Sequence, residues 1–184
     1  MPRILIANEG LSASKCCLSL KHREDVHLIC FDNRASNFAY LGYVDEVIPR
    51  PKDAGDDLFL NPEALIQAAK ECNAEWIYPG WGYLSECASF AARVEDAGLR
   101  FMGPSADTLH RLGNKIECAR LSEELGVPGL PWSKGPVDTL EDVKGWVAEI
   151  GLPVMLKAAL GGGGRGIRPV RTLGSLEEVY VNVR

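Results

Sequence analysis

The chain has 184 residues, of which 46% are hydrophobic, enough for one large domain or for one domain and part of a second. A net charge of −5 at pH 7, without a Lys/Arg cluster, argues against nucleic acid as a partner. No apolar run is long enough for a signal peptide or a membrane span, so we expect a cytoplasmic protein with no membrane partner.

Cysteine and histidine usage predicts no metal site. The six cysteines show no C-x-x-C pair and no histidine at zinc-ligand spacing; they stand at positions 16, 17, 30, 72, 87 and 118. We interpret them as structural thiols of a reducing compartment, because most have apolar neighbours. His22, His27 and His110 stand apart from one another, and we expect surface or core roles for them.

Residues 1–104 alternate short apolar runs with helical patterns. The apolar runs predict buried strands, and they cover residues 4–7, 26–31, 44–48, 76–78 and 99–104. One helical pattern follows Ser12, which we expect to be its N-cap, a second begins at Pro62, and a third follows the turn at residues 79–86. Residues 49–62 are rich in Pro, Asp and Gly and predict a loop.

This alternation predicts an α/β fold with an open parallel sheet and helices on both faces. Ligands of such sheets collect at the carboxyl ends of the strands. We therefore expect a substrate near the turns at Asn8 and at residues 80–82. The alternative is that the glycines there only shape the turns.

The remaining residues change in character. A helix after Ser105 is expected to break at Gly113 and Asn114, and Lys115 begins another that ends at Gly126. A connector rich in Pro and Gly covers residues 127–136, and an amphipathic helix is predicted over residues 140–150. We divide the chain into a first domain of residues 1–112 and a second part of residues 113–184, whose final helix begins at Ser175.

Four consecutive glycines, residues 161–164, lie between two apolar segments that read as strands. Lys157 and Arg165 flank them with positive charge, so we interpret the loop as a cover for the phosphates of ATP. A dinucleotide fingerprint requires a helix after the loop, which Pro169 would break. A Walker loop requires its lysine after the last glycine, whereas Lys157 precedes the loop. A flexible glycine linker remains the alternative.

Five segments occur in the order and approximate spacing of one known family. They are residues 4–10, 79–86, 101–104, 112–115 and 157–166. The sequence resembles the amino-terminal portion of biotin carboxylase, as found in acetyl-CoA, propionyl-CoA and pyruvate carboxylases. Trp81 and residues 130–133 are more similar to the large multidomain acetyl-CoA carboxylases than to other branches.

The resemblance implies a Rossmann-like domain over residues 1–112 and, over residues 113–184, the connector helix and the truncated start of an ATP-grasp domain. In this family ATP and bicarbonate form carboxyphosphate, and CO2 passes to a ureido nitrogen of biotin on a carrier protein. The residues that match ATP-binding positions are Lys115, Lys157, Gly163 and Gly164. Those that match the wall of the biotin site are Trp81, Gly82 and Glu86. The implied partners are the remaining part of the carboxylase, the biotin carrier domain and a second copy in a homodimer.

Several features depart from the family pattern. Glu9 replaces a frequent arginine, Leu160 a frequent glycine and Asn114 a frequent aspartate. In the family the Mg2+-binding glutamates and the general base follow the position of Arg184, so we assign no catalytic and no metal residue and do not expect these 184 residues alone to carboxylate biotin. The alternatives are a non-catalytic truncated paralogue that acts as a binding or regulatory module, and another ATP-grasp ligase related to carbamoyl-phosphate or glycinamide ribonucleotide synthetases.

Overall fold

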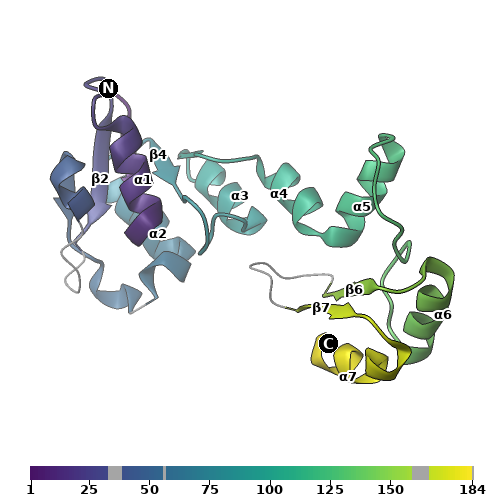
Figure 1. Cartoon of the computed structure of the whole chain (residues 1–184). Coiled ribbons are helices and arrows are strands. Elements are labelled where there is room, and N and C mark those ends of the chain that lie inside the picture. Colours follow the sequence, from purple (N-terminus) through teal and green to yellow (C-terminus); the bar gives the residue numbers. More distant parts are fainter. Residues whose placement is uncertain (33–38, 56, 159–165, 184) are drawn as a thin grey trace. The chain divides into compact units, whose positions relative to one another are not determined.

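The computed structural model describes residues 1–32, 39–55, 57–158 and 166–183 (Figure 1). The chain divides into two compact units, Met1–Leu109 and His110–Arg184. The first contains a five-stranded sheet and the second a two-stranded hairpin with helices.

The first unit is built on a parallel sheet with the strand order β3-β2-β1-β4-β5. Its strands are β1 (Arg3–Ile6), β2 (His27–Phe31), β3 (Glu46–Ile48), β4 (Trp76–Tyr78) and β5 (Arg100–Phe101). The predicted open parallel sheet is confirmed. The two edge strands are shorter than predicted. Before β3, the Asp45 N–H donates to the Leu28 carbonyl at 3.0 Å, and the Asp45 carboxylate accepts the Leu28 N–H at 2.7 Å.

Helices cover both faces of this sheet, as predicted (Figure 1). Leu5, Ile29 and Ile77 are fully buried and pack with residues of α2 (Pro62–Glu71) and α3 (Ala88–Asp96). Ile6 and Cys30 alternate with them and pack with α1 (Gly10–Leu20) and the 3-10 helix η1 (Ala39–Tyr43). This alternation follows from the period of two in a strand.

Two local expectations for the first unit are wrong. Ser12 does not cap α1, because the helix begins at Gly10, whose φ of +58° allows the chain to turn directly after Glu9. Ser12 is therefore buried within the first turn. The predicted loop at residues 49–62 contains two 3-10 turns, η2 (Lys52–Ala54) and η3 (Leu58–Leu60), because Leu58 and Phe59 enter the core.

The cysteines are free thiols, and Cys16, Cys17, Cys30 and Cys72 are buried, which agrees with a structural role. Burial, helped by the neighbouring Cys17, raises the pKa of Cys16 to about 12. A thiol with so high a pKa is a poor nucleophile at neutral pH.

An ionic cluster joins the amino ends of three strands. The Arg3 guanidinium donates to a Glu46 carboxylate oxygen at 2.5 Å and to the Cys72 carbonyl at 2.8 Å. His27 Nε2 lies 3.1 Å from the same Glu46 oxygen. His27 thus has an acidic partner from a neighbouring strand, which its sequence neighbours did not indicate. The hydrogen bonds from Arg3 and His27 lower the pKa of Glu46.

The second unit packs two helices against a β-hairpin. The elements from the end of the first unit onward are α4 (Ala106–Gly113), α5 (Lys115–Glu124), α6 (Leu140–Ile150), β6 (Val154–Lys157), β7 (Ile167–Val170), η4 (Leu173–Ser175) and α7 (Leu176–Val183). Val143 and Val147 of α6 form a buried cluster with Val170 of β7 and Leu176 of α7. The strands are antiparallel, with Val154 opposite Val170 and Lys157 opposite Ile167. A strand follows the glycine loop, so the dinucleotide fingerprint does not apply.

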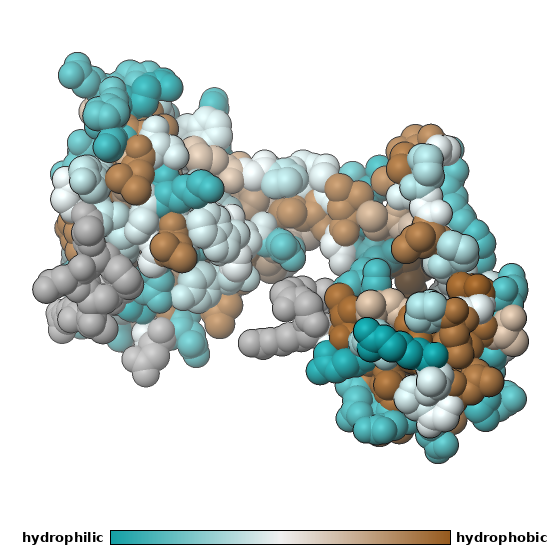
Figure 2. Space-filling model, viewed as in Figure 1, coloured by the Kyte–Doolittle hydropathy of each residue, from teal (hydrophilic) through white to brown (hydrophobic). Residues whose placement is uncertain are grey.

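Apolar side chains remain exposed on this chain, as the brown areas of Figure 2 illustrate. Among them are Leu112, Leu125, Val127 and Leu130, from α4, the end of α5 and the connector. No helix in the described part of the chain has both the length and the apolar character needed to cross a bilayer.

We expect Glu46→Gln to lower the free energy of unfolding by about 1 kcal/mol at pH 7, because a half-exposed charged acceptor is lost. Since the folded pKa of Glu46 is lowered, its contribution is complete above the ordinary carboxyl pKa of about 4.3 and is lost as the pH falls through the folded value. Urea unfolding at pH 7 and at pH 3 measures both effects. The control is Asp25→Asn in the exposed Arg23–Asp25 pair, which should be indistinguishable from wild type. An Asp25→Asn loss equal to that of Glu46→Gln would contradict the prediction.

Candidate functional site

The carboxyl ends of β1 and β4 form the candidate site in the first unit. The strands pair in parallel with Leu5 opposite Ile77 and Ile6 opposite Tyr78. The ladder continues for one more bond, from the Ala7 N–H to the Tyr78 carbonyl at 2.9 Å. Because the register is fixed, the turn after β1 lies beside the turn after β4, at the edge where parallel sheets bind ligands.

Asn8 holds the turn after β4 through its side chain. Its Nδ2 donates to the carbonyls of Pro79 at 2.6 Å and Trp81 at 3.0 Å, and its Oδ1 accepts the N–H of Glu9 at 2.8 Å. Asn8 is only 4% exposed. Each polar atom of the buried carboxamide thus has a partner, which fixes its orientation.

Ser12 approaches the same turn from the first turn of α1. Its Oγ accepts the N–H of Trp81 at 3.3 Å. Between these groups Gly80 adopts φ +64°, and a Cβ at this position would lie 1.8 Å from Ser12 Oγ. Only glycine satisfies both the conformation and the space.

The outer side of the turn is held by Tyr83. Its hydroxyl donates to Glu9 Oε1 at 2.9 Å, and its ring lies against Phe59 with centroids 5.3 Å apart. Burial, and then the bond to the Glu9 carboxylate, raise the pKa of Tyr83. The phenol therefore stays protonated as a donor at neutral pH.

The residues predicted for the biotin wall lie on or near this turn. Trp81 is 51% exposed, so its ring is available to a ligand while its backbone is held by Asn8 and Ser12. Gly82 has φ +74° and open space around it. Glu86 is exposed in the segment that leads into α3, and among the described residues no hydrogen bond ties it to the turn. The structure thus bonds Trp81 to Asn8 and places Gly82 next to it in the same turn, whereas Glu86 lies beyond the turn.

The residues predicted to bind ATP lie in the second unit. Lys157 is the exposed last residue of β6. Lys115 is the first residue of α5, after the N-cap Asn114, which accepts the N–H of Ile116 at 2.9 Å. A cation at the positive end of a helix gains nothing from the helix dipole, so helix stability does not explain Lys115. Gly163 and Gly164 lie outside the described residues.

Among the described residues, no group of three or more His, Cys, Asp and Glu side chains could hold a metal ion. The Mg2+ that the resemblance implies therefore has no ligand set in the part of the chain that the structure describes.

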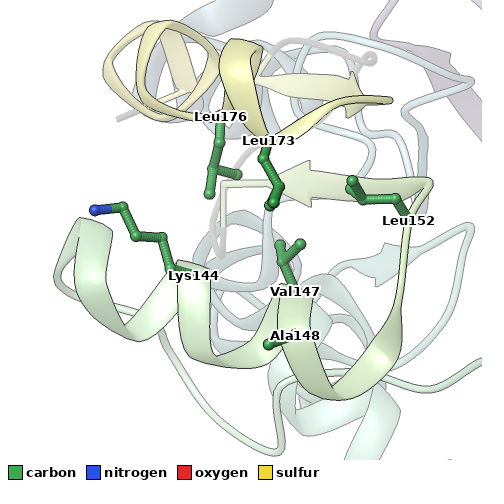
Figure 3. A pocket seen from close by; sticks show the side chains of 6 residues that line it. All are labelled: Lys144, Val147, Ala148, Leu152, Leu173 and Leu176. Atoms are coloured by element: carbon green, nitrogen blue, oxygen red, sulfur yellow. The ribbon is translucent and has the colours of Figure 1, made fainter.

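A hollow of about 480 Å³ lies between α6 and α7 of the second unit (Figure 3). It is lined by Lys144, Val147, Ala148, Leu152, Leu173 and Leu176, and the Lys144 amine points away from the apolar side chains. None of the predicted site residues lines it. Since ligand sites need a few converging polar groups, this apolar hollow is not the candidate site.

Sequence reasoning missed the roles of Ser12, Glu9 and Tyr83. Ser12 lies 69 residues from Trp81, so their contact depends on strand order. The one local signal is Gly80 after a strand and a proline, which indicates a close approach of backbone to another group.

We expect Gly80→Ala to destabilise the chain by about 2–4 kcal/mol, from left-handed strain together with overlap on Ser12. The control Gly82→Ala has similar strain but open space and should cost about 1 kcal/mol. Adding Ser12→Ala to Gly80→Ala should restore part of the loss. Urea unfolding measures all three, and equal losses for the two single variants would contradict the steric account.

Comparisons with known proteins match the two parts of the chain to two families. Residues 1–109 match the family described as biotin carboxylase, N-terminal domain, and residues 114–184 match that described as carbamoyl-phosphate synthase L chain, ATP binding domain. The chain is 35% identical to the biotin carboxylase of Haemophilus influenzae over 179 residues, which are 97% of this chain and 40% of that protein. It is 41% identical to the pyruvate carboxylase of Schizosaccharomyces pombe over 126 residues, 68% of this chain and 11% of that protein.

A solved structure is similar over nearly the whole chain. It is the biotin carboxylase domain dimer of the 2-oxoglutarate carboxylase of Hydrogenobacter thermophilus, in complex with MgADP, ADP and bicarbonate. The TM-score is 0.89 at 34% identity, over 98% of this chain and 40% of that one. The chain thus spans less than half the length of each of these relatives. Because the match to the amino-terminal domain covers more than half of its residues, the chain belongs to the biotin carboxylase family.

Proposed function

We propose that this chain supplies the amino-terminal part of a biotin carboxylase that uses ATP and bicarbonate to carboxylate biotin on a carrier protein. The observation that carries the proposal is the buried Asn8 contact that fixes a half-exposed tryptophan at the carboxyl edge of the sheet. A flat aromatic ring on a fixed backbone suits the compact bicyclic ring of biotin. We further propose that residues 1–112 and 113–184 are the two domains, with Trp81, Gly82 and Glu86 at the biotin wall.

ATP is proposed to lie against Lys115, Lys157, Gly163 and Gly164. The exposed position of Lys157 at the end of β6 supports this, because a lysine is a compact charge that can hold a phosphate oxygen with few geometric demands. In the proposed reaction its ammonium stabilises negative charge on the transferring phosphoryl group. The MgADP and bicarbonate bound to the Hydrogenobacter domain are consistent with this chemistry.

The final acceptor and the partners are also proposals. Trp81 and residues 130–133 favour an acetyl-CoA carboxylase type, whereas several of the relatives are pyruvate carboxylases, which makes pyruvate the second candidate. We propose the biotin carrier domain, the rest of the carboxylase and a second copy as partners; the Hydrogenobacter domain forms a dimer. The free buried thiols support a reducing compartment such as the cytoplasm.

The proposal is tested by a chimera in which this chain replaces the matching segment of the Haemophilus biotin carboxylase. We expect biotin-dependent release of ADP, and Lys157→Ala should lower kcat by about 10²–10³-fold, as for loss of a donor to transition-state charge. The control Lys144→Ala removes another exposed lysine of the second unit, one that is paired with Glu141, and should leave the rate unchanged.

Full activity of the Lys157→Ala chimera would contradict the role of this lysine. A folded chimera without biotin-dependent turnover would favour the non-catalytic binding module. Calorimetry of the chain alone with Mg-ATP is expected to show weak heat or none, because the glycine loop lacks the part of the ATP-grasp lobe that should hold adenine.

A further inference from the structure

The turn of residues 79–83 is held from two sides by the segment that follows β1. On the inner side, Asn8 donates to the Pro79 and Trp81 carbonyls and Ser12 accepts the Trp81 N–H. Reversing the Asn8 carboxamide would set its oxygen against two carbonyls and its amino group against the Glu9 N–H. The inner contacts therefore permit one arrangement of the turn.

On the outer side, Tyr83 occupies a conformation that its own backbone disfavours. Its φ is +41°, in the left-handed region where glycine carries no penalty and other residues are strained. A strained residue persists only where its surroundings hold it. Here the hydroxyl is bound to Glu9 and the ring packs on Phe59, which is 5% exposed. The Tyr83 side chain thus anchors the turn to Glu9 and Phe59, which a glycine in the same conformation could not do.

The two sets of contacts bracket Trp81. They fix the backbone on both sides of a ring that is half exposed. We propose that Asn8 and the Glu9–Tyr83 pair are positioning residues, which hold Trp81 in the orientation that contacts the ligand. This inference rests on the proposed function for the identity of that ligand, the bicyclic urea of biotin. Neither Asn8 nor Tyr83 needs to contact the ligand, because each acts through the turn.

The physical consequence is preorganisation. When the competent arrangement of the turn is only partly populated, the apparent dissociation constant rises by the inverse of that fraction. Loss of one hydrogen bond of ordinary strength makes local opening about five- to tenfold more frequent. Because β1 and β4 keep their own ladder, opening of the turn leaves the sheet intact.

The test compares Tyr83→Phe with Tyr43→Phe in the full 184-residue chain. Both tyrosines are 46% exposed, and Tyr43 lies in η1 with Lys21 Nζ 5.7 Å from the centre of its ring. NMR hydrogen exchange of the Trp81 to Ser85 amides in the free chain is the first readout. We expect about five- to tenfold faster exchange in Tyr83→Phe and no change in Tyr43→Phe, with exchange in β1 and β4 unaltered in both. Turn exchange in Tyr83→Phe equal to wild type would overturn the inference.

The second readout is the Trp81 indole N–H resonance during titration with biotin methyl ester. We expect the apparent Kd of Tyr83→Phe to rise by the factor by which the closed fraction of the turn falls, as calculated from its exchange rates, with Tyr43→Phe unchanged. A larger rise in Kd would show that Tyr83 contacts the ligand directly, and would overturn the inference. If wild-type Trp81 shows no shift, the proposed biotin wall fails, while the exchange result still decides whether the pair positions the turn. Asn8→Asp is a second variant, which tests the inner contacts. If it does not fold, the comparison of Tyr83→Phe with Tyr43→Phe tests the inference by itself.

Discussion

The pairing of β1 with β4 is the constraint on which the candidate site depends. The two strands are more than 60 residues apart in sequence, yet their register sets the carbonyl of Tyr78 against the N–H of Ala7 at 2.9 Å. This bond places Asn8, the residue after Ala7, beside the turn that follows β4. A register shift by one residue would also turn Leu5 and Ile77 away from the core. Burial of the sheet and geometry of the site therefore have the same cause.

The Asn8 carboxamide then determines what the turn can contain. A buried amide is stable only where each of its donors and acceptors has a partner. Two carbonyls of the turn must therefore face Asn8, and this places Gly80 against Ser12, where no Cβ fits. The requirement for glycine at position 80 therefore follows from the contacts that Asn8 makes after β1.

The sequence is sufficient for features that depend on near neighbours. Continuous apolar runs identify β1, β2 and β4, and Pro169 after the glycine loop indicates the hairpin of the second unit. The sequence is insufficient where the role of a residue depends on a contact with a residue far away in the chain. Ser12 has the composition of an N-cap, but Gly10 begins the helix earlier and Ser12 bonds to Trp81 instead. Likewise the partner of His27 is Glu46 of the adjacent strand β3, 19 residues later in the sequence. Roles of Lys115 and Lys157 stay predictions, since their proposed partner is a substrate.

The two parts of the proposed reaction are supported by different physics. The Trp81 backbone has little entropy left to lose on ligand binding, because both its N–H and its carbonyl are already hydrogen-bonded. Lys157, in contrast, is a long exposed side chain at the end of a strand, and ordering it on a phosphate costs about 2 kcal/mol of rotamer freedom. The lysine therefore needs further groups around the same phosphate, whereas the tryptophan turn is complete within the first unit. This difference explains why the chain alone is expected to hold ATP weakly even where its tryptophan turn is already ordered.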